Sequence, residues 1–246
     1  MVSPDRIQRN LTVPQLSRAH SPEEHVCLRS LNFYKSEACT SLVTQAAQGR
    51  HLRFLALPTA DSSAVQVQLC DDDYGGWLAI ADLPYLAPAT QPYAAPVLTA
   101  EAIQQCLPQA IAYAQRAMTQ PNEYLWGGTV APNFDCSGLV QAAFASAGIR
   151  LPRDAYQQEA FTQRMDLIAL QPGDLIFFGT PEKTTHVALY FGAGRYIHSS
   201  GKDQGRNGIG IDSIWDLSDP ISQTYHSQIR CAGRVVSSYK PGNLRG

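Results

Sequence analysis

The sequence predicts an α+β fold in two parts, a small β-rich module followed by a larger unit in which helices pack on an antiparallel sheet. Short apolar or alternating runs, separated by Gly, Pro, Asp and Ser, fill the first part. Helical patterns come first in the second part, and strand-like runs follow them. A stretch with three prolines, YLAPATQPYAAP, separates the two. The expected organisation is an arm at 1–20, a β module at 21–87, a linker at 88–98 and a second domain at 99–246.

The β module is expected to be a small closed barrel, because its strand-like runs are short and turn residues separate them. These runs are 25–34, 51–57, 65–69 and 77–80. Before the last run stands DDDYGGW, which contains Tyr74 and is more acidic and aromatic than a plain turn needs. We expect the aspartates at 71–73 to form a solvated turn rather than to bind a ligand directly.

Two helices open the second domain. Thr99 is a suitable N-cap for the segment 100–118, which Pro108 is expected to interrupt. The second helix begins after Asp135, repeats apolar residues at helical spacing, and ends at Gly148 in the left-handed conformation.

Strands follow these helices. Residues 174–178 predict one strand, and residues 186–191 and 195–199 predict a hairpin across Gly192-Ala193-Gly194. With this three-residue loop, His186 faces Ser200 and His198 is its diagonal neighbour on the same face, roughly 7–8 Å away between backbones. A loop of even length would place the two rings on opposite faces.

Cys136 stands in the first turn of the second helix, where backbone N–H groups and the helix dipole favour a thiolate. The dipole contributes only about 0.3–1 kcal/mol, whereas lowering a thiol pKa by one unit takes about 1.4 kcal/mol. A cationic partner is therefore needed. His186 is the candidate base and His198 the residue that orients its ring.

Other interpretations of these residues exist. A single cysteine on an amphipathic helix is commonly a small buried apolar residue, and a strand histidine is commonly a packing residue. Zinc would require short ligand spacings, but the chain has no CxxC, HxxxH or HExxH. We therefore expect neither a metal site nor a cofactor.

Five blocks, YLWGG, DCSGLV, LPRDAYQQ, QPGDLIFFG and THVALYFGAGRYIHSSG, occur in this order between about residues 100 and 235. This part of the chain resembles the NlpC-type cysteine peptidases of bacterial cell-wall metabolism, which have a papain-like fold, and the β module resembles a bacterial SH3-like domain. The resemblance implies that Cys136 is the nucleophile, His186 the general base and then acid, and His198 the polar third member. It places Tyr124 beside the oxyanion site.

The resemblance also implies a substrate. In two-domain relatives the barrel closes one end of the groove, so only short peptides with a free amino terminus fit; the implied peptide is L-Ala-γ-D-Glu-diaminopimelate. Asp154 matches the position that binds its amine, with Tyr74 and Ser137 lining the same pocket and Trp126 also contacting substrate. Asp154 could equally cap the helix AYQQEAF, and both roles can coexist. Ala155 follows, where relatives commonly carry serine, so one hydrogen bond to the amine is expected to be absent.

The expected function is therefore a γ-D-glutamyl-diamino acid endopeptidase that acts on murein tripeptide in cell-wall recycling. An exported hydrolase of intact wall and a non-catalytic wall-binding protein remain the alternatives. The oligomeric state and the partners of the distal carboxylate stay open; Lys202 and Arg206 are candidates for the latter, although a mobile cationic loop explains them better.

Composition agrees with a globular enzyme, since 44% of the 246 residues are apolar and 16% are charged. The net charge of −2 gives no sign of nucleic-acid binding. The first residues lack the apolar run of an export signal, no stretch is long enough for a membrane span, and the six cysteines are scattered. We therefore expect a cytoplasmic location and no membrane partner.

Overall fold

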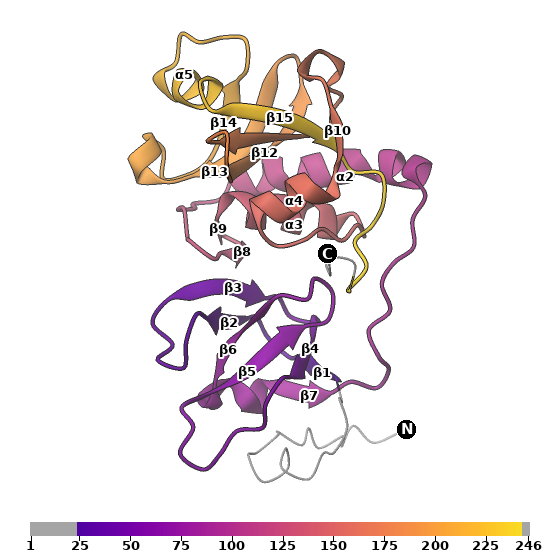
Figure 1. Cartoon of the computed structure of the whole chain (residues 1–246), viewed down its shortest axis with the longest axis vertical. Coiled ribbons are helices and arrows are strands. Elements are labelled where there is room, and N and C mark those ends of the chain that lie inside the picture. The colour runs from indigo at the N-terminus through magenta and orange to yellow at the C-terminus, as the bar shows by residue number, and fades with distance from the viewer. Residues whose placement is uncertain (1–23, 243–246) are drawn as a thin grey trace, which may run out of the picture. The chain divides into compact units, whose positions relative to one another are not determined.

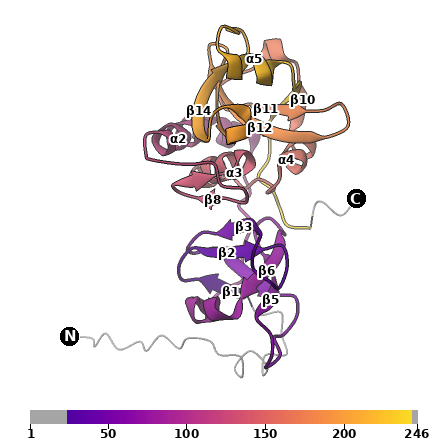
Figure 2. The same ribbon diagram turned by 90° about the vertical axis from the view of Figure 1, so that its left-hand side faces the viewer.

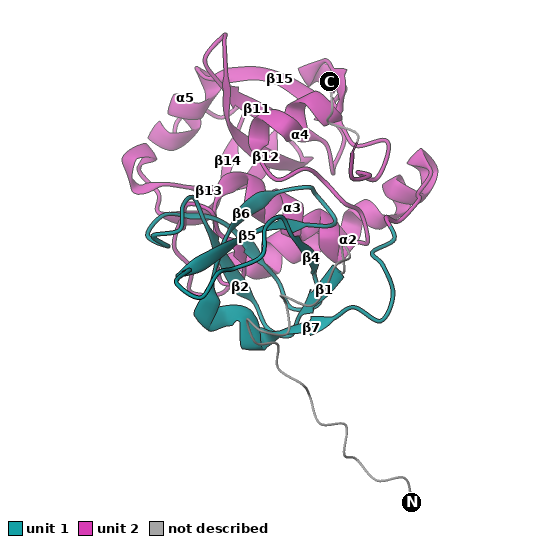
Figure 3. Ribbon diagram, turned by 60° about the horizontal axis from the view of Figure 1, so that its bottom comes forward, with its two compact units in different colours: residues 1–94 teal, residues 95–246 magenta. Residues whose placement is uncertain are grey.

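The computed structural model describes residues 24–242, and the chain divides into two compact units, residues 1–94 and 95–246 (Figure 3). The arm predicted at 1–20 lies outside the described residues. Each unit has its own hydrophobic core.

The first unit is one antiparallel sheet of seven strands, in the order β3-β2-β6-β5-β4-β1-β7. The strands curl around a core that includes Phe33, Leu52, Val67 and Leu78 (Figure 2). Their bounds are β1 (Glu24–Cys27), β2 (Leu31–Tyr34), β3 (Leu42–Ala46), β4 (His51–Phe54), β5 (Ala64–Leu69), β6 (Gly75–Ala79) and β7 (Leu86–Pro88), with a 3-10 turn η1 (Ile80–Tyr85) before β7. The predicted β-rich, SH3-like module is confirmed. The predicted run 25–34 is nevertheless two strands, and β3 was missed because its LVTQA is short and half polar.

The expected solvated turn at 71–73 is wrong for its first two residues. Asp71 and Asp72 are buried, and both are ion-paired with Arg50 at 2.6 and 2.8 Å. Asp72 also accepts the backbone N–H of Tyr74 at 3.0 Å. A buried carboxylate needs such donors to offset the loss of hydration, and Arg50 supplies them from 21 residues earlier.

The second unit contains a six-stranded antiparallel sheet in the order β10-β15-β11-β12-β13-β14. The strands are β10 (Gln163–Met165), β11 (Leu175–Gly179), β12 (Thr184–Gly192), β13 (Arg195–Ser200), β14 (Gly208–Ser213) and β15 (Ile229–Arg234). The helices are α2 (Ala100–Met118), α3 (Cys136–Ser146), α4 (Ala155–Phe161) and α5 (Pro220–His226), with 3-10 turns η2 (Leu167–Ala169) and η3 (Lys202–Gln204). A two-stranded ribbon, β8 (Thr129–Val130) and β9 (Asn133–Phe134), leads into α3.

Helices cover both faces of this sheet. In two perpendicular views α2, α3 and α4 lie on one face and α5 on the other (Figures 1 and 2). The side chains alternate accordingly: Val187 and Leu189 of β12 belong to the core under α3, whereas Ala188 and Tyr190 belong to the core under α5. The predicted α+β class is confirmed. Helix α5 was not anticipated, since its seven residues carry too short a pattern.

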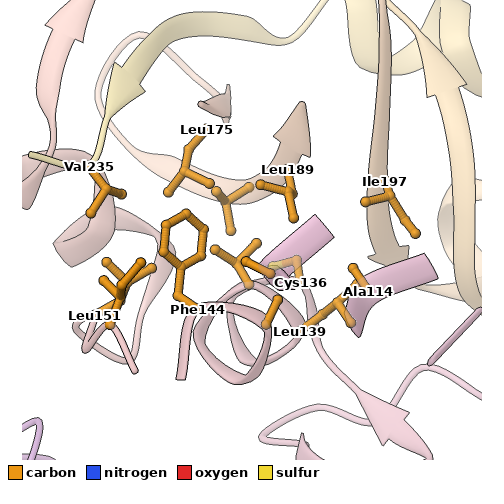
Figure 4. Close-up of a cluster of buried hydrophobic side chains, with 14 of the residues drawn as sticks. Ala114, Cys136, Leu139, Phe144, Leu151, Leu175, Leu189, Ile197 and Val235 are labelled. Carbon is orange, nitrogen blue, oxygen red and sulfur yellow. The ribbon is translucent and has the colours of Figure 1, made fainter. Parts of the chain in front are cut away.

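Helix α3 packs its apolar side against the sheet, as Figure 4 shows for Leu139 and Phe144 beneath Leu175 and Leu189. Cys136, at the start of the helix, belongs to the same buried cluster. The sequence made two predictions about helix ends and interruptions that the structure tests. Gly148 ends α3 with φ +78°, as predicted. Pro108 does not interrupt α2, because the buried face of that helix holds it together across the one missing N–H donor.

Two of the three residue pairs that join β12 and β13 have the predicted register, Leu189 opposite Ile197 and Tyr190 opposite Tyr196. The ladder ends there, so the predicted pair of His186 with Ser200 is not part of it. The same register makes His186 and His198 diagonal neighbours on the α5 face of the sheet. At the turn the prediction is wrong by one residue, because a bulge places Gly192, rather than Phe191, opposite Arg195.

Candidate active site

Cys136 is the first residue of α3, and Asp135 is its N-cap, accepting the N–H of Gly138 at 2.7 Å. The cap satisfies one of the N–H groups that the first turn of a helix leaves without an intrahelical partner. The sulfur accepts hydrogen bonds from the backbone N–H groups of Ser137 and Val187. Val187 follows His186 on β12, so the thiol lies beside the backbone of the candidate base.

Asp135 also binds Arg153, which the sequence analysis did not single out. The guanidinium donates to both carboxylate oxygens, at 2.6 and 3.2 Å, and both side chains are buried. Asp135 further accepts the N–H of Gly127 at 2.9 Å. One ion pair therefore joins the YLWGG loop, the nucleophile helix and the LPRDAYQQ segment, which are separate in the sequence.

Burial changes the expected charge state of the nucleophile. It raises the pKa of Cys136 to about 12, with a further rise from the Asp135 carboxylate, and the hydrogen bonds from Val187 and Ser137 offset only part of this. Burial also lowers the pKa of His186 well below its usual value. Burial of both side chains thus favours the neutral thiol and the neutral imidazole, and it opposes the effect of the helix start on the thiol.

The two histidines form a hydrogen-bonded pair. Nε2 of His186 lies 2.7 Å from Nδ1 of His198, and both rings are buried. Three aromatic side chains contact the pair: Phe178, Tyr196 and Tyr225. Tyr225, on α5, is tilted over His186 with ring centroids 4.6 Å apart. These rings exclude water and restrict the rotation of both imidazoles.

The pair continues to an acid that the sequence analysis missed. Asp212 on β14 places Oδ2 at 2.5 Å from Nε2 of His198, and its Oδ1 lies 2.6 Å from Nη2 of Arg206. Arg206 is thus engaged with Asp212, and a role of Arg206 or Lys202 toward a distal substrate carboxylate remains a prediction. In the structure Asp212 lies opposite Tyr196, on the strand that follows the hairpin. The sequence has no turn pattern that predicts the pairing of β13 with β14, so it did not place Asp212 near His198.

The buried histidines predict a loss of stability in acid. Their pKa values are lowered by burial from the ordinary 6.5, so below about pH 6.5 the unfolded chain binds protons that the folded chain does not. The free energy of unfolding should therefore fall between about pH 7 and pH 5, by up to about 1.4 kcal/mol per pH unit for each histidine. The lowered pKa of Asp212 acts only at more acidic pH, since its contribution is present above the ordinary value of 3.8. The free energy of unfolding, measured by urea denaturation at each pH, should fall less steeply with decreasing pH in His186→Gln than in the native protein. An equal pH dependence in the two proteins would contradict this prediction.

The structure places the other predicted residues as follows. Tyr124 is half-buried and pairs in a short bridge with Phe134; burial and the nearby Cys136 raise the pKa of its hydroxyl. Trp126 is 72% exposed. Ser137 is buried, and its hydroxyl donates to Asp135 and accepts from Arg153. The substrate contacts of Trp126 and Ser137 remain predictions.

Asp154 is half-buried at the start of α4 and forms a capping box with Gln157. The alternative role as cap of AYQQEAF is therefore confirmed, and amine binding remains a prediction beside it. Tyr74 belongs to the first unit, and its role in a substrate pocket also remains a prediction.

Residues 24–242 contain no group of three or more His, Cys, Asp or Glu side chains arranged to hold a metal ion. Within the same range, no helix combines the length and apolar character that crossing a membrane requires. All six cysteines are free.

A cysteine at a helix start, beside a buried histidine pair on an antiparallel sheet, defines a thiol-dependent hydrolase of papain-like architecture. Comparison with protein families agrees with this class. Residues 121–231 match the NlpC/P60 family, and residues 33–83 match the bacterial dipeptidyl-peptidase Sh3 domain. The chain thus carries an NlpC/P60 domain preceded by a bacterial SH3 domain.

Several known protein sequences are similar to part of the chain. The probable endopeptidase p60 of Listeria monocytogenes is 41% identical over 91 residues, which is 37% of this chain and 18% of p60. In Bacillus subtilis, the bifunctional muramidase/DL-endopeptidase CwlT and a gamma-DL-glutamyl hydrolase are each 46% identical over 81 residues, 31% of this chain and 25% and 20% of their own lengths. The alignments therefore span a quarter or less of these relatives. Together with the family match, they support a cysteine peptidase.

A solved structure of an NlpC/P60 family protein from Bacillus cereus ATCC 10987 aligns with 87% of this chain and 64% of its own chain. The sequence identity is 25% and the TM-score is 0.47.

Proposed function

We propose that this protein is a cysteine endopeptidase that hydrolyses the bond between γ-linked D-Glu and a diamino acid such as diaminopimelate in short murein peptides. The observation that carries the proposal is the thiol of Cys136 beside the hydrogen-bonded pair of His186 and His198. The relatives named as DL-endopeptidase and gamma-DL-glutamyl hydrolase support the choice of bond.

The proposed hydrolysis starts from a neutral Cys136 thiol and a neutral His186 imidazole. His186 takes the proton of the Cys136 thiol as the sulfur attacks the amide carbon, and the S–H bond is exchanged for an N–H bond. The backbone N–H of Cys136 and the Tyr124 hydroxyl stabilise the oxyanion. His186 then donates the proton to the leaving amine of the diamino acid. Water, activated by His186, hydrolyses the thioester and releases the D-Glu carboxylate.

Selectivity for a free amino terminus is assigned to Asp154. A carboxylate held by its own helix cap is a rigid partner for an ammonium, and the half-buried position strengthens their attraction. Ala155 offers no hydroxyl to the same amine. The reaction is proposed to serve recycling of wall peptides in the cytoplasm.

The test is incubation of the protein with free L-Ala-γ-D-Glu-diaminopimelate and, separately, with intact peptidoglycan. We expect the free tripeptide to yield L-Ala-D-Glu and diaminopimelate, identified by mass spectrometry, and intact peptidoglycan to release almost none. Release from peptidoglycan alone would indicate a wall hydrolase. Binding to peptidoglycan with no cleavage of either would indicate a wall-binding protein.

A further inference from the structure

The two oxygens of the Asp212 carboxylate have different partners. Oδ2 faces Nε2 of His198 at 2.5 Å, and Oδ1 faces Nη2 of Arg206 at 2.6 Å. The hydroxyl of Ser222 lies 3.5 Å from Oδ1 as well. Only 2% of the Asp212 side chain and none of the His198 side chain is exposed to solvent, so water does not replace these partners.

We propose that Asp212 is a positioning residue that sets the tautomers of both histidines in series and thereby leaves Nδ1 of His186 as the basic atom of the site. This inference rests on the proposed function, because it identifies the base of that reaction. An ionised carboxylate only accepts, so Nε2 of His198 must carry a hydrogen. A neutral imidazole has one N–H, so Nδ1 of His198 accepts from His186. Nε2 of His186 therefore carries its hydrogen, and its lone pair is on Nδ1.

This polarity suits the position of the nucleophile. Nδ1 is the ring nitrogen nearer the backbone of His186, and the Cys136 sulfur accepts the N–H of the next residue, Val187. When the S–H bond breaks, its proton forms the N–H bond at Nδ1. Both hydrogen bonds further along, from His186 to His198 and from His198 to Asp212, stay in place as His186 becomes positive. No side chain has to rotate during the transfer.

Arg206 makes the proposal testable, because a guanidinium only donates hydrogen bonds. In Asp212→Asn the amide oxygen must face Arg206, so the amide NH₂ group faces Nε2 of His198. Nδ1 of His198 then carries the hydrogen and donates to Nε2 of His186. The hydrogen of His186 moves to Nδ1, where it faces the thiol and removes the base.

The experiment compares the full-length protein with Asp212→Asn, Asp212→Asn/Arg206→Met and Asp219→Asn. The last is the matched control, because Asp219 caps α5 beside Ser222 but is not bonded to His198. Tripeptide cleavage and iodoacetamide labelling of the Cys136 peptide are measured, the second being independent of substrate. We expect Asp212→Asn to lose cleavage by about 10³–10⁴-fold, the scale known for a catalytic histidine held in the wrong tautomer, and to label more slowly. The double variant should cleave at least about tenfold faster than Asp212→Asn, because without Arg206 the amide introduced at position 212 can turn its oxygen toward His198. Asp219→Asn should cleave and label at the native rates.

His198→Gln is the polarity-preserving variant. A glutamine amide can donate to Asp212 and accept from Nε2 of His186, so it leaves the lone pair at Nδ1. His198→Gln should therefore retain more activity than Asp212→Asn, although it replaces a side chain that contacts both His186 and Asp212.

Imidazole ¹⁵N NMR reads the tautomers directly. The native protein should show His186 protonated at Nε2, and Asp212→Asn should show it protonated at Nδ1. A native His186 protonated at Nδ1 overturns the proposal even if Asp212→Asn does not fold. Unchanged tautomers in folded Asp212→Asn, or no recovery in the double variant, also overturn it. Expected tautomers in a protein that does not cleave the tripeptide would reject the proposed substrate and leave this inference standing.

Discussion

Replacing Cys136 with alanine should abolish tripeptide cleavage, with a loss of at least about 10⁵-fold, because no other group in the site can form the covalent intermediate. His186→Ala should lose nearly as much activity, because removal of one member of a catalytic unit leaves the other members ineffective. The rate is measured by mass spectrometry of released diaminopimelate at saturating peptide.

Cys106→Ala is the control for this experiment. Cys106 is half-buried on α2 and belongs to the packing of the same core, so its truncation tests the effect of a small cavity without touching the site. It should keep native activity. Thermal unfolding of each variant establishes that the fold is intact, and a Cys136→Ala protein that still cleaves would reject the thiol mechanism.

Acetylation of the substrate amine should slow cleavage of L-Ala-γ-D-Glu-diaminopimelate by about 10²-fold or more. The acetylated peptide carries no ammonium, so its binding would lack the attraction between that charge and the half-buried Asp154 carboxylate. The comparison of kcat/KM for free and acetylated peptide measures this effect directly.

Asp154→Asn separates amine binding from helix capping. Asparagine caps a helix about as well as aspartate, so α4 should keep its start and the protein its stability. The variant should lose most activity on the free peptide, while its rate on the acetylated peptide changes little. The ratio of the two cleavage rates should therefore be smaller than in the native protein. Equal rates of the native protein on both peptides would reject the recycling role and favour a hydrolase of intact wall.

Local patterns of the sequence were sufficient for helices α2, α3 and α4 and for strands β11, β12 and β13 of the second unit, but not for β14, β15 or α5. The cap at Thr99 and the stop at Gly148 follow from residues close together in the chain, and the structure has both. The hairpin register follows in the same way and holds at Leu189 and Tyr190, but not at the bulged turn. The register by itself made His186 and His198 neighbours, because side chains of diagonal residues on one face of a hairpin can meet. The family resemblance likewise rested on short blocks in a fixed order.

Only the tertiary structure revealed the ion pairs. The buried or partly buried ion pairs are those of Asp135 with Arg153, of Asp71 and Asp72 with Arg50, and of Asp212 with Arg206. In a sequence, a charged residue that will be buried looks the same as one on the surface, since its burial depends on which distant segments pack around it.

The charge state of the nucleophile was decided in the same way. From its helix start alone, Cys136 was expected to favour a thiolate, because the dipole and free N–H groups are local features. Packing of α3 against the sheet removes the thiol from water, and this desolvation outweighs the local terms. The sequence by itself determined which residues could react and in what order they occur. The packed structure determined which distant groups surround Cys136 and the two histidines, and therefore the direction in which burial shifts their pKa values.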